Sequence, residues 1–248
     1  MAAIRLTLQE ASELSPDTIR ELYALVRATG FPMDDGYLEE AHFSHNPTVL
    51  MARTAMGQLI GFQSFNKYRL KTPFSRRPIS FLYGGLAFQH TTQAQRRVGF
   101  KLTMRYLRHA LGPLWFMRQY AFMTRTATPR VMQILSLQHQ LFTHQGGTLT
   151  PNIVAFALNV ARTVRRIPDR YTIDKRLVLS SPPESTHEAD ITDQWQTLYQ
   201  AKNEYFNQLA FDCNLIVQRN GRYYLTQSYL LLIGYHSPKR LWSHWRKR

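Results

Sequence analysis

The residues best suited to chemistry lie in segment 81–111, where an apolar strand pattern leads through a polar loop into a basic helix start. Three cations, Arg96, Arg97 and Lys101, flank the beginning of this predicted helix. The unpaired N–H groups and the dipole of a helix N-terminus attract anions, and the three side chains add full charges. Gly99 lets the backbone approach a ligand closely. The segment therefore predicts a cradle for a phosphate-bearing ligand.

Two other readings of this segment follow from its residues. Neither of the common glycine-rich phosphate motifs, GxxxxGK[ST] and GxGxxG, occurs in the chain. P-loop and Rossmann sites are therefore disfavoured. The remaining alternative is a solvated first turn of an ordinary helix.

The elements that position the segment are indicated by periodicity and by turn residues. Ser15 and Pro16 are typical of an N-cap and a first helical position, and Gly30 of a helix end. The predicted order is strand 4–8, a helix from Pro16, a second short helix with Glu39, Glu40 and His42, strands 49–54, 58–68 and 79–89, helix 98–111, strand 115–126 and helix 130–141.

Beyond about residue 150 the pattern becomes less regular. It predicts helices over 153–164 and 190–210, a strand at 177–179, a loop over 180–188 and a hairpin with Asn220-Gly221 at its turn. A basic segment over 162–176 and a basic tail over 239–248, which carries Trp242 and Trp245, complete this part.

At residues 96–101 the sequence resembles the GNAT superfamily of acyl-CoA-dependent N-acyltransferases, whose signature has Arg or Gln, then Gly three residues on and Gly or Ala five residues on. Two registers fit. Arg96 opens the motif if Gly99 is its first glycine and Lys101 replaces the second. Alternatively, Gly99 is the second glycine, Arg97 replaces the first and Ala94 the opening residue.

The order of elements over residues 4–141 is also that of the family, and segment 120–130 resembles its fifth strand and the following turn. The resemblance implies an α/β (α+β) fold with a mixed, mostly antiparallel central sheet flanked by helices. We expect a GNAT-like acyl-CoA-binding core over residues 1–180. Residues 181–248 are expected to form a C-terminal extension that completes the sheet or provides the acceptor side.

The resemblance further implies acyl-CoA as co-substrate, either acetyl-CoA or a longer-chain thioester, and no metal. In this family the thioester lies between the fourth and fifth strands, and a backbone N–H of the fourth strand polarises its carbonyl. The residues expected to bind the cofactor are Leu86, Ala87, Phe88, Arg96, Arg97, Val98, Gly99, Phe100, Lys101, Thr128 and Arg130.

Proton transfer has several candidates. An amine with a pKa near 10.4 must lose a proton before it attacks, and His90, or one of Glu39 and Glu40, could accept that proton. The alternative for each is an ordinary surface residue. Many family members protonate the leaving thiolate with a tyrosine on the helix after the fifth strand, but segment 130–141 contains none. Tyr120 or His139 could substitute, or the thiolate could leave unaided.

The acceptor is expected to be an amine of a small molecule, a peptide or a protein, such as lysine or ornithine. In this fold the amine enters near the turn over 31–36 and the short helix after it. Asp34, Asp35 and Glu39 would attract a cationic amine there, although the whole chain is positive.

Charge widens the list of partners. The chain has 31 Lys and Arg against 16 Asp and Glu, a formal net charge of +15. Anionic partners are therefore expected, and they include an acidic carrier protein or an anionic membrane surface. A non-enzymatic nucleic-acid-binding protein that uses segments 162–176 and 239–248 is the main alternative.

The remaining composition points to a folded protein in a reducing, cytoplasmic setting. Hydrophobic residues make up 44% of the chain, and Cys213 is the single cysteine, so no internal disulfide can form. No apolar stretch approaches the roughly 20 residues of a transmembrane helix, and Glu10 and Glu13 fall where a secretory signal would be apolar.

Overall fold

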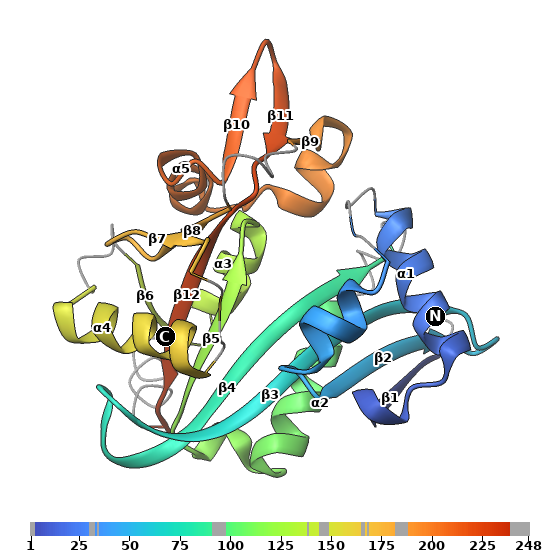
Figure 1. Ribbon diagram of the computed structural model, residues 1–248, viewed down its shortest axis with the longest axis horizontal. Coiled ribbons are helices and arrows are strands. Elements are labelled where there is room, and N and C mark those ends of the chain that lie inside the picture. The colour runs from blue at the N-terminus through green and yellow to red at the C-terminus, as the bar shows by residue number, and fades with distance from the viewer. Residues whose placement is uncertain are drawn as a thin grey trace. The chain divides into compact units, whose positions relative to one another are not determined.

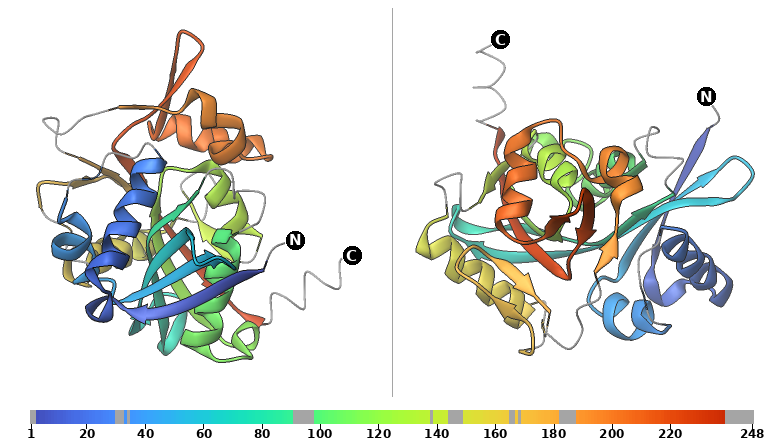
Figure 2. Two further views of the ribbon diagram at one scale, coloured as in Figure 1. Left: turned by 90° about the vertical axis from the view of Figure 1, so that its right-hand side faces the viewer. Right: turned by 90° about the horizontal axis from the view of Figure 1, so that it is seen from above.

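The structure is a computed structural model, which describes residues 3–29, 33, 35–90, 98–137, 139–143, 149–164, 167, 169–181 and 188–238. The chain forms two compact units (Figures 1 and 2). The first contains Met1–Tyr68 and Leu82–Arg118, and the second Arg69–Phe81 and Gln119–Arg248. Each unit is described by itself.

The sheet of the first unit is built from consecutive strands. Its order is β1 (Ile4–Glu10), β2 (Thr48–Thr54), β3 (Leu59–Thr72) and β4 (Ser75–Gln89). Strands β1 and β2 pair antiparallel, as do β2 and β3, which confirms the hairpin predicted there. Strands β3 and β4 are long enough that their ends at residues 69–81 belong to the second unit.

The helices of the first unit are η1 (Ala11–Glu13), α1 (Pro16–Ala28), the π-helix η2 (Tyr37–Phe43), α2 (Val98–Leu111) and η4 (Trp115–Met117). The helices α1, η2 and α2 bury apolar side chains, whereas η1 and η4 bury none. The Ser15 hydroxyl accepts a hydrogen bond from the Thr18 N–H (3.2 Å), which confirms the predicted N-cap. Leu22 and Val26 of α1 form a buried core with Phe62 of β3.

The second unit has its own strands, which meet at β12 (Ser228–His236). This strand pairs antiparallel with β5 (Tyr120–Thr126), β6 (Gln140–Phe142) and β8 (Val178–Ser180), and β8 also pairs with β7 (Thr172–Ile173). A small separate sheet holds β9 (Ala189–Asp190), β10 (Ile216–Arg219) and β11 (Arg222–Leu225). Asn220 and Gly221 connect β10 and β11 with φ of 51° and 76°, as expected of a hairpin turn.

The helices of the second unit are α3 (Pro129–Ser136), α4 (Pro151–Asn159), η5 (Val160–Val164), η7 (Thr192–Gln194), η8 (Trp195–Tyr199) and α5 (Glu204–Asp212). Met132 of α3, Trp195 of η8 and Leu209 of α5 are buried in one core with Leu232 of β12. The C-terminal part of the chain therefore shares a hydrophobic core with segment 119–143.

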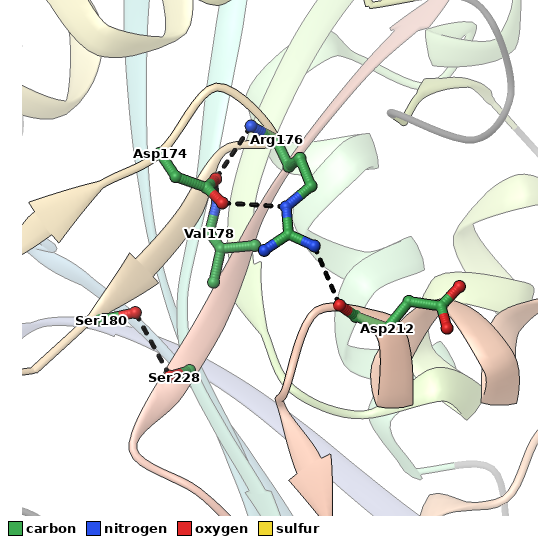
Figure 3. A network of polar contacts seen from close by, with 6 residues as sticks. All are labelled: Asp174, Arg176, Val178, Ser180, Asp212 and Ser228. Atoms are coloured by element: carbon green, nitrogen blue, oxygen red, sulfur yellow. Dashed lines mark hydrogen bonds and ion pairs between the residues drawn. The ribbon is translucent and has the colours of Figure 1, made fainter.

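A polar network ties the turn before β8 to the end of α5 (Figure 3). Asp174 accepts hydrogen bonds from the N–H groups of Arg176 and Val178 (2.8 Å each) and from the Arg176 guanidinium (2.9 Å). The same guanidinium donates to the carbonyl of Asp212, the last residue of α5 (2.9 Å). Leu177 adopts a φ of 64° in this turn, a strained conformation that the surrounding bonds hold in place.

Three expected elements differ from the structure. The helix predicted over 130–141 ends at Ser136, because residues 140–142 join β12 as β6. Segment 115–126 is extended only from Tyr120 onward. The single helix predicted over 190–210 was wrong, because Asn203 caps a new helix by accepting a hydrogen bond from the Tyr205 N–H (3.0 Å).

The order from β1 to α3 is otherwise the predicted one, and each strand pair described above is antiparallel. The fold class, a mixed α/β fold with a mostly antiparallel sheet flanked by helices, is therefore confirmed. The division at residue 180 stays a prediction. Within the described residues, no helix has the length and apolar content needed to cross a membrane.

Gly234 in β12 provides a test of this packing. It lies opposite Phe122 of β5, and a Cβ built on it would be 2.2 Å from Cε1 of the Phe122 ring. Gly234→Ala should lower the free energy of unfolding by about 1–3 kcal/mol because the ring must move. Urea denaturation measures this. The double variant Gly234→Ala with Phe122→Leu should lose less than the two single losses added together, and strict additivity would contradict the contact.

Candidate functional site

A glycine in β3 brings the start of α2 against the end of β4. A Cβ built on Gly61 would lie 2.7 Å from Cγ1 of Val98 and 3.2 Å from the carbonyl oxygen of Phe88. Val98, the first residue of α2, is fully buried. The structure thus brings together three of the residues predicted to bind a cofactor, Phe88, Val98 and Gly99.

The first turn of α2 presents an open side at Gly99. Its N–H donates to Oε1 of Gln89 (3.3 Å), and among the atoms of the described residues a Cβ there would meet only that oxygen, at 3.8 Å. The side chains of Phe100 and Lys101 are exposed. Arg96 and Arg97 lie outside the described residues, so their predicted role stays a prediction.

The end of β4 has two different faces. Leu86 and Phe88 pack against the core formed by α1, η2 and β3, where the Phe88 ring lies 5.7 Å from that of Phe62. Ala87 is exposed between them. His90 follows the strand, and its N–H donates to the Ile60 carbonyl (2.9 Å).

A buried polar cluster lies directly behind this segment. Nε2 of His42 is 2.6 Å from the Ser64 hydroxyl, 3.1 Å from Nδ2 of Asn46 and 3.3 Å from the backbone nitrogen of Leu86. His42, Ser64 and Asn46 are all buried. An amide N–H can only donate, so Nε2 accepts the hydrogen bond from Leu86 and the proton of a neutral imidazole is on Nδ1.

Glycine is required opposite this cluster. A Cβ on Gly85 would lie 2.4 Å from the Ser64 hydroxyl oxygen and 2.8 Å from Nε2 of His42. The space left by the missing side chain is therefore filled by protein. Sequence reasoning placed His42 on the correct short helix but gave it no role. The available signal was a serine within the apolar run of β3 and a glycine pair in β4.

Two of the acidic residues predicted near the acceptor, Glu39 and Asp35, already have partners. The Tyr23 hydroxyl donates to Oε2 of Glu39 (2.7 Å), and burial together with this carboxylate raises the pKa of Tyr23 to about 12. Asp35 pairs with Arg27. A Cβ on Gly36 would lie 3.2 Å from a carboxylate oxygen of Glu40. Asp34 lies outside the described residues.

In the second unit, Tyr120 and His139 form one buried hydrogen bond. The Tyr120 hydroxyl is 2.7 Å from Nε2 of His139, and Nδ1 of that ring is 3.2 Å from the Leu135 carbonyl. Nδ1 therefore donates to Leu135, and Nε2 accepts from the tyrosine. The ring of His236 stacks on Tyr120 with centroids 4.8 Å apart. The two residues expected as alternative acids thus share a single interaction.

The other two residues predicted to bind the cofactor also belong to the second unit. Thr128 is the N-cap of α3, and its side chain makes no capping hydrogen bond. Arg130, in the first turn of α3, donates to the carbonyl of Thr197. The Arg130 guanidinium, which was predicted to bind the cofactor, therefore already uses one of its N–H donors within the protein.

Two arginines of segment 162–176, which was considered for nucleic-acid binding, instead donate hydrogen bonds to backbone carbonyls of the protein. Arg162 donates to the carbonyls of Ile167 (3.0 Å) and Tyr171 (2.7 Å), and Arg176 donates to that of Asp212. Arg165, Arg166 and the tail over 239–248 lie outside the described part of the chain. In that part, no three His, Cys, Asp or Glu side chains are grouped as a metal site would need.

Burial of His139 makes stability depend on pH. Burial, more than the neighbouring His236, lowers the pKa of His139 to about 3 from an ordinary value near 6.5. Between pH 6.5 and 3, the imidazole of His139 is therefore protonated in the unfolded chain and neutral in the folded chain. Stability is complete above this window and falls as the pH is lowered through it, by at most about 1.4 kcal/mol per pH unit.

The His139→Gln variant should show a shallower decline of unfolding free energy between pH 6.5 and 4 than the wild type does. Urea denaturation at several pH values measures the slope. His109→Gln, a change at an exposed histidine of α2, is the matched control and should keep the wild-type slope. An unchanged slope in His139→Gln would contradict a neutral buried imidazole.

Comparison with known proteins gave matches among solved structures only. No protein-family model and no curated protein sequence matches the chain. Naa20 of Chaetomium thermophilum, solved with a bisubstrate analogue, is 13% identical with a TM-score of 0.38, over 55% of this chain and 72% of that one. ElaA of Escherichia coli is 16% identical with a TM-score of 0.39, over 57% and 90%.

NAA60 of Arabidopsis thaliana, solved with acetyl-CoA, is 12% identical with a TM-score of 0.38, over 54% of this chain and 90% of that one. These scores are low, and the comparison with the family rests on the elements themselves. Strand, two helices, three strands, helix, strand and helix follow one another from β1 to α3 in the order that the GNAT resemblance predicts.

Proposed function

We propose that the protein is an acyl-CoA-dependent N-acyltransferase that moves an acetyl or longer acyl group to an amine. The observation that carries the proposal is the junction of β4 and α2, where Gly61 seats the start of the helix against the end of the strand. A basic, glycine-bearing helix start at this point of the element order is what the resemblance implies for a CoA site.

The direction of the backbone N–H groups in β4 selects one donor for the thioester carbonyl. The N–H of Leu86 is bonded to His42 and that of His90 to Ile60 of β3. Successive N–H groups of a strand point to opposite edges, so Ala87 directs its N–H away from β3. We assign Ala87 as the donor that polarises the carbonyl of the bound thioester.

The reaction is a direct transfer within a ternary complex. The amine nitrogen forms a bond to the acyl carbon, the carbon–sulfur bond breaks, and its electron pair leaves on the thiolate of CoA. The ammonium loses one proton before attack and the nitrogen a second one afterwards, and the thiolate takes up one proton. Alignment of the two substrates can supply roughly 7–11 kcal/mol of the barrier, more than one general base does.

For the base we retain His90, which lies next to the end of β4, and Glu40 as the second candidate. Tyr120 stays a candidate acid through its hydrogen bond to His139. Its burial raises the pKa of the phenol, so the neutral form can donate a proton but resists forming phenolate. The acceptor is proposed to enter near Asp34, Asp35 and Glu39, where carboxylates would attract a cationic amine.

The proposal predicts that Arg96→Glu with Arg97→Glu weakens CoA binding by about 100-fold or more, because two cations near the phosphates become anions. Calorimetric titration with CoA measures the dissociation constant. Pantetheine, which lacks the pyrophosphate and the ribose phosphate, should bind the variant and the wild type alike.

Arg76→Glu with Arg77→Glu, on the exposed part of β4, is the control of equal charge and should bind CoA like the wild type. Unaltered CoA affinity in the Arg96 and Arg97 variant would contradict the cradle. The function itself is tested by release of free thiol from acetyl-CoA and longer acyl-CoAs in the presence of amines. Nanomolar, salt-sensitive nucleic-acid binding without thiol release would favour the alternative.

A further inference from the structure

The turn after α2 exposes apolar side chains next to one another. Leu114, Phe116 and Met117 are 61%, 41% and 49% exposed, and all three lie in or beside η4. Gly112, with a φ of 89°, allows the sharp change of direction that separates this turn from the helix. Isolated apolar residues are common on protein surfaces, but three within four positions form a patch.

Arginines precede and follow this patch in the chain. Arg105 and Arg108 are exposed on α2, and Arg118 follows η4 directly. A Cβ built on Gly112 would be 4.0 Å from Nη2 of Arg118, so this guanidinium lies against the turn itself. Among the ion pairs that the described residues form, none involves these three arginines.

The sequence around the patch contains no acidic side chain. The 16 Asp and Glu residues all lie in segments 1–40 and 169–248, and the stretch from Ala41 to Pro168 has none. The net charge of +15 is thus distributed unevenly, and α2 and η4 lie within the stretch that carries only cations. Charge complementarity therefore favours an anionic partner here.

We propose that one surface of the first unit docks on an anionic lipid bilayer. This α2–η4 surface consists of Arg105, Arg108, Leu114, Met117 and Arg118. Of the three exposed apolar side chains, only Phe116 could stack on a base, whereas Leu114 and Met117 add nothing to nucleic-acid binding. At a bilayer they enter the boundary between headgroups and acyl chains, while the arginines remain at the headgroups. This inference does not depend on the proposed enzymatic activity.

Sedimentation with vesicles of phosphatidylcholine and phosphatidylserine (70:30) tests the proposal on the full-length protein. The wild type should bind these vesicles and leave vesicles of phosphatidylcholine alone in solution. Arg105→Glu with Arg108→Glu should lower the partition coefficient at least about tenfold, because each cation near such a surface contributes about fivefold. Leu114→Gln with Met117→Gln should lower it about tenfold.

Two matched controls separate this surface from general charge and general hydrophobicity. Arg76→Glu with Arg77→Glu also reduces the net charge from +15 to +11, since 15 − 4 = 11, and should keep at least half of the binding. Ile134→Gln with Leu137→Gln changes one apolar residue of α3 and the one at its C-cap, which are 41% and 76% exposed, and should do the same. Circular dichroism and thermal melting must show that every variant is folded.

Three results would overturn the proposal. The first is equal loss of binding in the arginine variants of the surface and of the control, since binding would then follow net charge alone. The second is binding to vesicles without phosphatidylserine, or to neither kind. The third is complete release from vesicles by duplex DNA or polyglutamate at a charge concentration equal to that of the lipid, which would assign the surface to a soluble polyanion.

Discussion

Close approach between backbone and side chains at two glycines is the constraint on which the first unit depends. Gly61 in β3 leaves room for Val98, and Gly85 in β4 leaves room for the imidazole of His42. The first contact fixes where α2 begins relative to β4. The second fixes a short helix behind the same strand. The junction of β4 and α2 is therefore set by missing side chains rather than by any single strong attraction.

The sequence allowed the elements of this unit to be predicted because their signals are local. Ser15 and Pro16 show where α1 begins, and the fourfold spacing of apolar residues gives α2 its observed bounds. The helix end at Ser136 was missed because it depends on a partner far away in the chain, whereas the helix start at Asn203 has a local cap that the sequence analysis overlooked. Residues 140–142 leave a helical pattern to join β12, and only the fold supplies that strand.

The candidate site was predictable only in part, for the same reason. Strand β4, the basic segment after it and Gly99 at the start of α2 are close together in the sequence, so their association could be predicted. The cluster of His42, Ser64 and Asn46 joins a helix to a strand 22 residues away, and nothing local connects them. The roles of two arginines could not be predicted either. In the sequence Arg162 and Arg176 resemble parts of a basic surface, but in the structure each donates a hydrogen bond to a backbone carbonyl.

The contact of Gly85 with His42 and Ser64 has a consequence for how this protein can diverge. A methyl group at position 85 collides with two side chains at once, so it is tolerable only after one of them has become smaller. Loss of the imidazole alone leaves the partly buried Leu86 N–H without this acceptor, which costs up to about 1–3 kcal/mol. Positions 42, 64 and 85 should therefore change in a preferred order, with strong epistasis between them, and related proteins should carry compatible sets rather than independent substitutions.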